Sequence, residues 1–144
     1  MLKSNNSKFR SKCPISCSLD IFGDKWSLLI IRDMVIEQKK TFKDFFSSNE
    51  KIASNILTSR LKSLEKIGII SKNSVLNNKK TSIYKLTDSG LSLIPILLEM
   101  KVWSENNIEF HKKRSEPSSL SIKNKQKNIE EIKSKYLRSF NNIL

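Results

Sequence analysis

Residues 53–88 have the sequence ASNILTSRLKSLEKIGIISKNSVLNNKKTSIYKLTD, in which the spacing of the apolar residues changes along the chain. Leu57, Leu61 and Leu64 recur every three or four residues, which predicts an amphipathic helix over residues 53–67. The residues on its opposite face are all polar: Asn55, Ser59, Lys62 and Lys66. The helix therefore buries one stripe and offers a polar face to solvent or to a partner.

A β-hairpin is expected directly after this helix. Gly68 follows the last periodic position, where a residue with a left-handed backbone commonly ends a helix. Residues 69–75 predict one strand, and the residues after a polar turn at 77–80 predict a second. In the second strand, alternation places Ser82, Tyr84 and Leu86 on one face and Ile83 and Lys85 on the other.

Two helices are expected before the stretch 53–88. Apolar residues at helical spacing predict a first helix from Leu19 to about Ile36. Thr41, with Asp44 three residues later, has the pattern of a capping box and predicts a second, short helix. Residues 47–50 then form a turn into the amphipathic helix.

Further helices are expected after the hairpin. Thr87 supplies a cap for a helix that should bend at Pro95. Residues 111–127 are charged and rich in serine, which is typical of a linker. Apolar residues after this linker could line a terminal helix: Ile129, Ile132, Tyr136, Phe140 and Ile143.

Helix, short helix, turn, amphipathic helix and two-stranded hairpin is the element order of a winged helix-turn-helix domain. The major groove of DNA admits one α-helix, and Asn, Ser, Thr, Arg and Lys side chains bond base edges and phosphates. On the helix over residues 53–67, the central candidates for DNA contact are Asn55, Ser59 and Lys62, and the flanking candidates are Ser54, Thr58 and Arg60. The hairpin tip would reach phosphates or the minor groove through Asn77, Asn78, Lys79 and Lys80.

The charge distribution favours a polyanionic partner such as double-stranded DNA. Lys and Arg total 27 against 14 acidic residues, which gives a formal net charge of +13. Residues 51–85 contain eight basic residues and one acidic residue, whereas residues 13–50 and 86–107 are slightly acidic. Genome composition explains a large number of lysines but does not explain this contrast between segments.

Three functional hypotheses follow from these patterns. The leading one is a sequence-specific DNA-binding transcriptional regulator. A non-specific nucleic-acid or nucleoid protein would use the same basic surface only to neutralise phosphates. A protein-interaction module on the same fold would bind DNA weakly at physiological salt. Competitor DNA discriminates among them, because only specific binding survives it.

A set of short fragments occurs in a fixed order along the chain: CPI at 13–15, LDIFGDKW at 19–26, LIIRD at 29–33, FKDF at 42–45, IASNILTSRL at 52–61, LE at 64–65, GI at 68–69 and YKLTDSG at 84–90. In these fragments and their spacing, the sequence resembles the HxlR family of MarR-like, winged-helix bacterial regulators. The resemblance runs from Cys13 to about Trp103. Two departures put the shape of the hairpin in doubt: Asn77 to Lys80 replace a proline-containing wing, and Ser82 occupies a position that is usually β-branched.

The resemblance implies an α+β, mainly α fold: a winged helix-turn-helix with extra N- and C-terminal dimerisation helices. We expect a basic N-terminal tail at 1–12, the HxlR-type domain at 13–107, and a basic linker with a C-terminal helix at 108–144, to which nothing carries over from the family. The resemblance also implies a homodimer on a pseudo-palindromic operator. The expected interface residues are Leu29, Ile30, Leu98, Val102 and Trp103. Carried over by position, the recognition-helix residues would be Ser54, Asn55, Thr58, Ser59, Arg60 and Lys62, and the wing tip would be Asn78, Lys79 and Lys80.

Cys13 is a candidate redox or electrophile sensor, as the resemblance implies for a cysteine just before the first helix. Pro14 suits the first position of a helix, so Cys13 would lie at the cap, where the helix dipole with Arg10 and Lys12 favours the thiolate. Cys17 would be a resolving thiol, and an oxidant or small molecule would be the effector. The alternative is a pair of inert thiols, which is usual in the cytoplasm.

Other chemistry finds little support in the sequence. The single histidine, His111, has no nearby acid or nucleophile, so we expect no enzyme. Two cysteines without a second ligand pair do not make a zinc site, and we expect no metal and no cofactor. Residues 1–12 are polar and basic, without an apolar stretch, and no run reaches the length of a membrane span. We therefore expect a cytoplasmic protein with no membrane partner.

Overall fold

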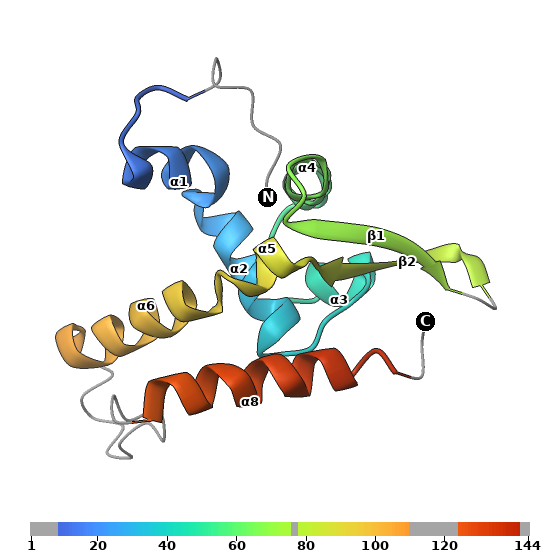
Figure 1. Cartoon of the computed structure of the whole chain (residues 1–144). Helices are drawn as coiled ribbons and strands as arrows, with labels where there is room; N and C mark the ends of the chain where they lie inside the picture. The colour runs from blue at the N-terminus through green and yellow to red at the C-terminus, as the bar shows by residue number, and fades with distance from the viewer. Residues whose placement is uncertain (1–8, 76–77, 110–123, 142–144) are drawn as a thin grey trace.

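The computed structural model describes residues 9–75, 78–109 and 124–141 (Figure 1). Its elements, in chain order, are α1 (Pro14–Phe22), α2 (Lys25–Val35), α3 (Phe42–Phe46), α4 (Ser54–Lys66), β1 (Ile70–Val75), β2 (Asn78–Leu86), α5 (Asp88–Leu91), α6 (Ile94–Asn107) and α8 (Lys125–Arg138). The fold is α+β and mainly α, as predicted: α3 and α4 form the helix-turn-helix, and β1 and β2 form the wing.

The single first helix expected from Leu19 to Ile36 is wrong, because the chain breaks into α1 and α2 at Gly23. Asp24 caps α2: its Oδ1 atom accepts hydrogen bonds from the backbone N–H groups of Trp26 (3.1 Å) and Ser27 (3.0 Å). A Cβ atom on Gly23 would lie 2.5 Å from the carbonyl oxygen of Leu19, so a larger residue does not fit this bend. The helical spacing of apolar residues continues across the break, so periodicity in the sequence does not reveal it.

The helix-turn-helix begins and ends as the sequence predicts. Thr41 Oγ1 accepts from the N–H of Asp44 (3.2 Å), and Asp44 Oδ2 accepts from the N–H of Thr41 (2.9 Å), which completes the capping box of α3. Gly68, just after α4, has φ 80°, a left-handed conformation that suits glycine and ends the helix. Leu57 and its stripe on α4 are buried.

The hairpin pairs β1 with β2 in antiparallel register, from Ile70 opposite Leu86 outward. The alternation predicted for β2 did not say which face meets the core, and both Ile83 and Tyr84 are buried. Ile83 forms a β-bridge with Thr41, and the N–H of Tyr84 donates to the carbonyl of Lys40 (2.8 Å). The chain before α3 thus covers the edge of β2 away from β1.

The expected bend at Pro95 is instead a break between two helices. Thr87 caps α5 by accepting from the N–H of Gly90 (3.2 Å), as predicted, but α5 ends at Leu91. Pro95 lies in the first turn of α6, where its missing N–H costs no hydrogen bond. Gly90 is buried because the backbone of Ile69 passes directly beside it.

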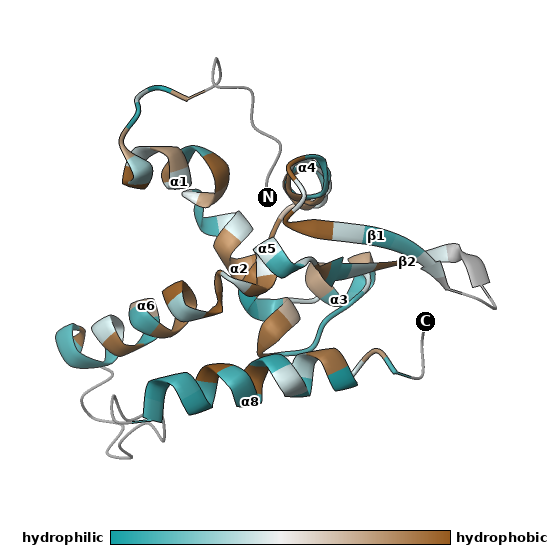
Figure 2. Ribbon diagram, viewed as in Figure 1, coloured by the Kyte–Doolittle hydropathy of each residue, from teal (hydrophilic) through white to brown (hydrophobic). Residues whose placement is uncertain are grey.

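A single core joins the helices, the hairpin and α8. Its fully buried side chains come from α2, α3, α4, the residue before β1, β1, α6 and α8, and the largest are Tyr136, Phe45, Ile31, Met34, Leu57, Leu61, Leu64, Ile69, Ile70 and Ile94. The apolar stripe predicted for the terminal helix packs on this core, although Ile143 lies outside the described residues. Hydrophobic and hydrophilic residues accordingly alternate along α8 (Figure 2).

None of the helices in the described part of the chain combines the length and the apolar character needed to cross a bilayer. Most of the expected linker at 111–127 and most of the tail at 1–12 lie outside the described residues.

Candidate nucleic-acid interface

The outward face of α4 carries most of the residues expected to contact DNA. Burial of the leucine stripe against the core fixes which side of α4 points outward. The polar residues on that side are exposed and line one open surface hollow: Ser54, Asn55, Thr58, Ser59 and Lys62. The structure therefore brings five of the six predicted α4 residues together.

Two of these side chains also bond to their own helix. Thr58 Oγ1 donates to the carbonyl of Ser54 (2.8 Å), so this hydroxyl hydrogen is used within α4. Asn55 Oδ1 accepts from the N–H of Ile56 (2.9 Å) at the first turn. Because the oxygen of Asn55 is held there, its Nδ2 group is the end of the amide that can donate to a base edge without breaking a bond.

Arg60, the sixth predicted residue, has a different position. Its Nη1 atom lies 3.3 Å from Oδ2 of Asp24, the residue that caps α2, and the side chain is half-buried. Burial opposes ionisation of Asp24, but hydrogen bonds from Ser27 and the charge of Arg60 hold its pKa below the ordinary value. Arg60 thus ties α4 to the start of α2 rather than standing on the outward face.

The hairpin residues differ from their predicted conformation. Asn78, Lys79 and Lys80 were expected in a turn, but all three belong to β2, which begins at Asn78. The pairing is irregular here, because Val75 opposes Asn78 while Ser74 opposes Ser82. These residues still lie at the far end of the hairpin from the core (Figure 1); Asn77 lies outside the described residues.

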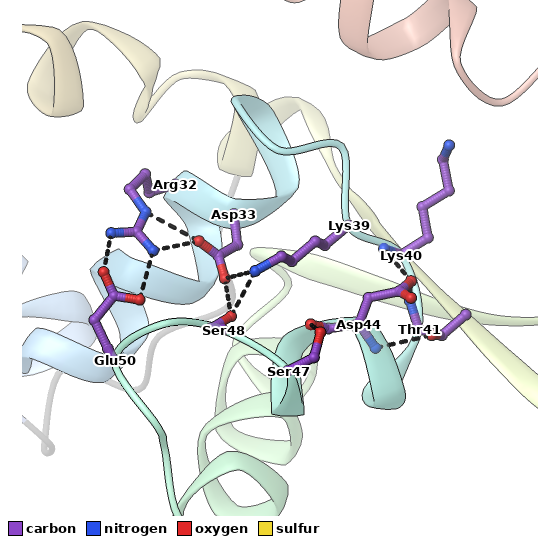
Figure 3. Close-up of polar contacts among 9 residues, drawn as sticks. All are labelled: Arg32, Asp33, Lys39, Lys40, Thr41, Asp44, Ser47, Ser48 and Glu50. Carbon is purple, nitrogen blue, oxygen red and sulfur yellow. Dashed lines mark hydrogen bonds and ion pairs between the residues drawn. The ribbon is translucent and has the colours of Figure 1, made fainter.

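A polar cluster holds the turn that leads into α4, and sequence reasoning missed it (Figure 3). Asp33 is buried at the end of α2 and accepts hydrogen bonds from Arg32 Nε (2.9 Å), Lys39 Nζ (2.9 Å) and the Ser48 hydroxyl. Arg32 also donates to both carboxylate oxygens of Glu50, at 2.6 and 3.0 Å. The available signal was the charged pair Arg32 and Asp33 inside an otherwise apolar run at 28–35.

The cluster has a clear electrostatic signature. Hydrogen bonds from Arg32 lower the pKa of Glu50 to about 2. The same contacts raise the pKa of Arg32 above its ordinary value. Both groups therefore stay charged at neutral pH, and the residues just before α4 remain fixed to α2.

Cys13 has the predicted position and Cys17 lies one turn beyond it. Cys13 is exposed at the N-cap of α1, and Pro14 occupies the first turn. The Cys17 thiol is half-buried and donates to the carbonyl of Ser11 (3.4 Å). Arg10 forms an ion pair with Asp20 (2.6 Å), so its charge is shared with that carboxylate rather than reserved for Cys13.

The predicted interface residues fall into two groups. Ile30 and Leu98 are buried in the core of the protomer, which corrects their expected place on an exposed dimer surface. The reason is that α2 is central, with α4, α6 and α8 packed around it. Leu29 and Val102 are half-buried, and Trp103 is 62% exposed.

Comparison with known proteins agrees with this arrangement. The HxlR-like helix-turn-helix family model matches residues 21–112. The HTH-type transcriptional regulator YdeP of Bacillus subtilis (strain 168) is 36% identical over 93 residues, covering 65% of this chain and 72% of YdeP. The redox regulator HypR in its oxidized form has a TM-score of 0.58 and 36% identity, covering 66% of this chain and 97% of HypR. Quinone-bound YodB from B. subtilis has a TM-score of 0.54 and 28% identity, covering 65% and 99% of the two chains.

The family consists of transcriptional regulators rather than enzymes, and its model spans α2 to α6, the helix-turn-helix and wing included. DNA is the partner that a regulator with this motif binds. The chain belongs to the HxlR-like helix-turn-helix family of DNA-binding transcriptional regulators.

Proposed function

We propose that this regulator binds a pseudo-palindromic operator as a homodimer, with α4 in the major groove and the hairpin on flanking phosphates or the minor groove. The exposed polar face of α4 carries the proposal, because the amide of Asn55 and the hydroxyls of Ser54 and Ser59 there can bond to base edges. Asn55 and Ser59 would contact bases. Lys62, Lys79 and Lys80 would hold phosphates, since lysine acts as a point charge.

Exposed apolar side chains on α1 and α6 support a dimer. Ile15 is 72% exposed and Leu19 is 57% exposed on α1, and α6 exposes Met100 and Trp103. Apolar side chains gathered on two helices are typical of an interface between copies of a chain. A twofold dimer would place two α4 helices about 34 Å, or one DNA turn, apart.

Asn55→Ala tests the reading of bases. The wild-type protein first selects a duplex from a random DNA library, and two protomers per duplex are expected on it. Asn55→Ala should weaken binding to this duplex by roughly 1 to 3 kcal/mol and leave binding to a scrambled duplex unchanged. Fluorescence anisotropy with both duplexes measures the two affinities.

Two further variants complete that experiment. Ser63→Ala is the matched control, because Ser63 is exposed on α4 but does not line the hollow. Lys79→Ala with Lys80→Ala should weaken both duplexes alike and flatten the salt dependence by roughly 1.8 in log–log slope. Equal preference of wild type and Asn55→Ala for the selected duplex would remove α4 from base recognition. Failure to select any duplex would favour the non-specific alternative.

We also propose that Cys13 senses oxidants. Its exposure at the N-cap of α1 supports this role, because an oxidant in solution can reach the sulfur. Similarity to a redox regulator and to a quinone-bound regulator lends further support. Peroxide would oxidise the thiolate to a sulfenic acid and release hydroxide. A second thiol would then condense with the sulfenic acid, forming a disulfide and water.

Cys13→Ser should abolish the response of DNA affinity to oxidants. A disulfide involving Cys13 would re-angle α1 and change the distance between the α4 helices of a dimer, so treated wild type should lose at least about tenfold in affinity. The affinity of both proteins for the selected duplex is compared before and after peroxide or diamide. Unchanged wild-type affinity, with no crosslinked dimer on a non-reducing gel, would eliminate the sensor role.

A further inference from the structure

Helix α8 lies beyond the family match, which ends at residue 112, yet it packs firmly on the domain. It contacts α2 and α6, and α2 separates it from α4 (Figure 1). Tyr136 is completely buried and Phe140 nearly so, with their rings edge to face at 5.2 Å between centroids. The helix therefore belongs to the core while standing away from the outward face of α4.

The hydroxyl group of Tyr136 contacts the root of the wing, which is the end of β2 at Leu86. Its hydroxyl oxygen accepts a hydrogen bond from the backbone N–H of Leu86 at 2.7 Å, 50 residues earlier in the chain. Alternate N–H groups of a strand point to the same side, and that of Tyr84 donates away from β1, to Lys40. The N–H of Leu86 therefore also points away from β1. Tyr136 supplies a buried acceptor where the hairpin has no third strand.

Phe140 makes a second contact with the same region. The ammonium groups of Lys40 and Lys85 lie 5.0 and 5.2 Å from the centroid of its ring. Both distances suit cation–π attraction. Lys40 precedes α3 and Lys85 lies on β2, so one ring joins the helix-turn-helix to the wing.

We propose that α8 braces the wing, with Tyr136 and Phe140 as positioning residues that hold the root of β2 for DNA binding. The inference rests on the proposed use of the hairpin in DNA binding. A hairpin fixed at its root keeps its far end at a defined place relative to α4, whereas a loosened root spreads the far end over many positions. The brace therefore acts on the phosphate contacts of the wing and leaves base reading by α4 unchanged.

Tyr136→Phe tests the brace in the full chain, because it removes one hydroxyl and keeps the ring in the core. The amide of Leu86 should exchange with solvent at least about tenfold faster. Affinity for the duplex selected by wild type should fall about fivefold, with a shallower salt dependence, because wing phosphate contacts are lost. Tyr84→Phe is the matched control, since it removes a phenolic hydroxyl from β2 and leaves the acceptor of the Leu86 N–H in place.

A double variant distinguishes bracing from general loss of stability. Adding Tyr136→Phe to Lys79→Ala with Lys80→Ala should cost less than about 1.5-fold in affinity, because the wing contacts are already absent. An unchanged salt dependence in Tyr136→Phe, or a full fivefold loss in the wing-deficient background, would overturn the proposal. Failure of wild type to prefer any duplex would instead refute the proposed function, and faster exchange of the Leu86 amide would still be measurable.

Discussion

Asp33→Asn is expected to lower the free energy of unfolding by about 3 to 5 kcal/mol. The Asp33 carboxylate is buried and accepts from Arg32, Lys39 and Ser48. An amide in its place keeps one acceptor oxygen, so its N–H groups would face either Arg32, which donates to Oδ1, or Lys39, which donates to Oδ2. The Lys39 side chain, only 20% exposed, would lose its countercharge. Urea unfolding of the full chain, followed by circular dichroism at pH 7, measures the change.

An exposed ion pair provides the control for this prediction. Glu131 lies 3.9 Å from Lys127 on α8, with both side chains largely in solvent. Glu131→Gln should therefore change stability by at most a few tenths of a kcal/mol. If Asp33→Asn costs less than about 1 kcal/mol, water screens the cluster and the turn before α4 is held by other contacts. Lys39→Met should be clearly non-additive with Asp33→Asn, because the two residues share one interaction.

Gly90→Ala is expected to cost at least about 3 kcal/mol, at or beyond the upper end of the usual range for overpacking. A Cβ atom on Gly90 would lie 2.3 Å from the carbonyl oxygen of Ile69 and 2.8 Å from Cδ2 of Leu86. The first of these is backbone at the start of the hairpin and cannot turn aside as a side chain can. Thermal unfolding compared with wild type measures the loss.

Ser92→Ala is the neighbouring control, since Ser92 is exposed just after α5. Its stability should stay within about 0.5 kcal/mol of wild type, as is usual for surface substitutions. A Gly90→Ala variant as stable as wild type would mean that α5 moves away from β1 at little cost. The close approach of backbones would then not be needed for the fold.

Local patterns predicted much of this fold because the physics behind them is local. The leucine stripe of α4, the capping box at Thr41 and the left-handed Gly68 each involve residues within a few positions of one another. The exposed face of α4 follows directly from its buried face. Five candidate DNA-contacting residues could therefore be named before the structure was known.

Several features that the sequence did not predict involve partners that are distant in sequence. Arg60 falls on the polar side of α4, and its pairing with Asp24 spans 36 residues. Ile83 is covered by the segment before α3, and Ile30 is covered because α2 is the central helix. Periodicity reports which residues of one element share a face, but it does not report what packs on that face.

The Tyr136–Leu86 hydrogen bond also bears on the order in which the protein is completed during synthesis. Ribosomes add roughly 5 to 20 residues per second, so Tyr136 is made about 2.5 to 10 seconds after Leu86. A hairpin forms in microseconds, far faster than this interval. During this interval the N–H of Leu86 has no Tyr136 hydroxyl to donate to. The rate of translation, and not the rate of folding, therefore determines when this hydrogen bond can form.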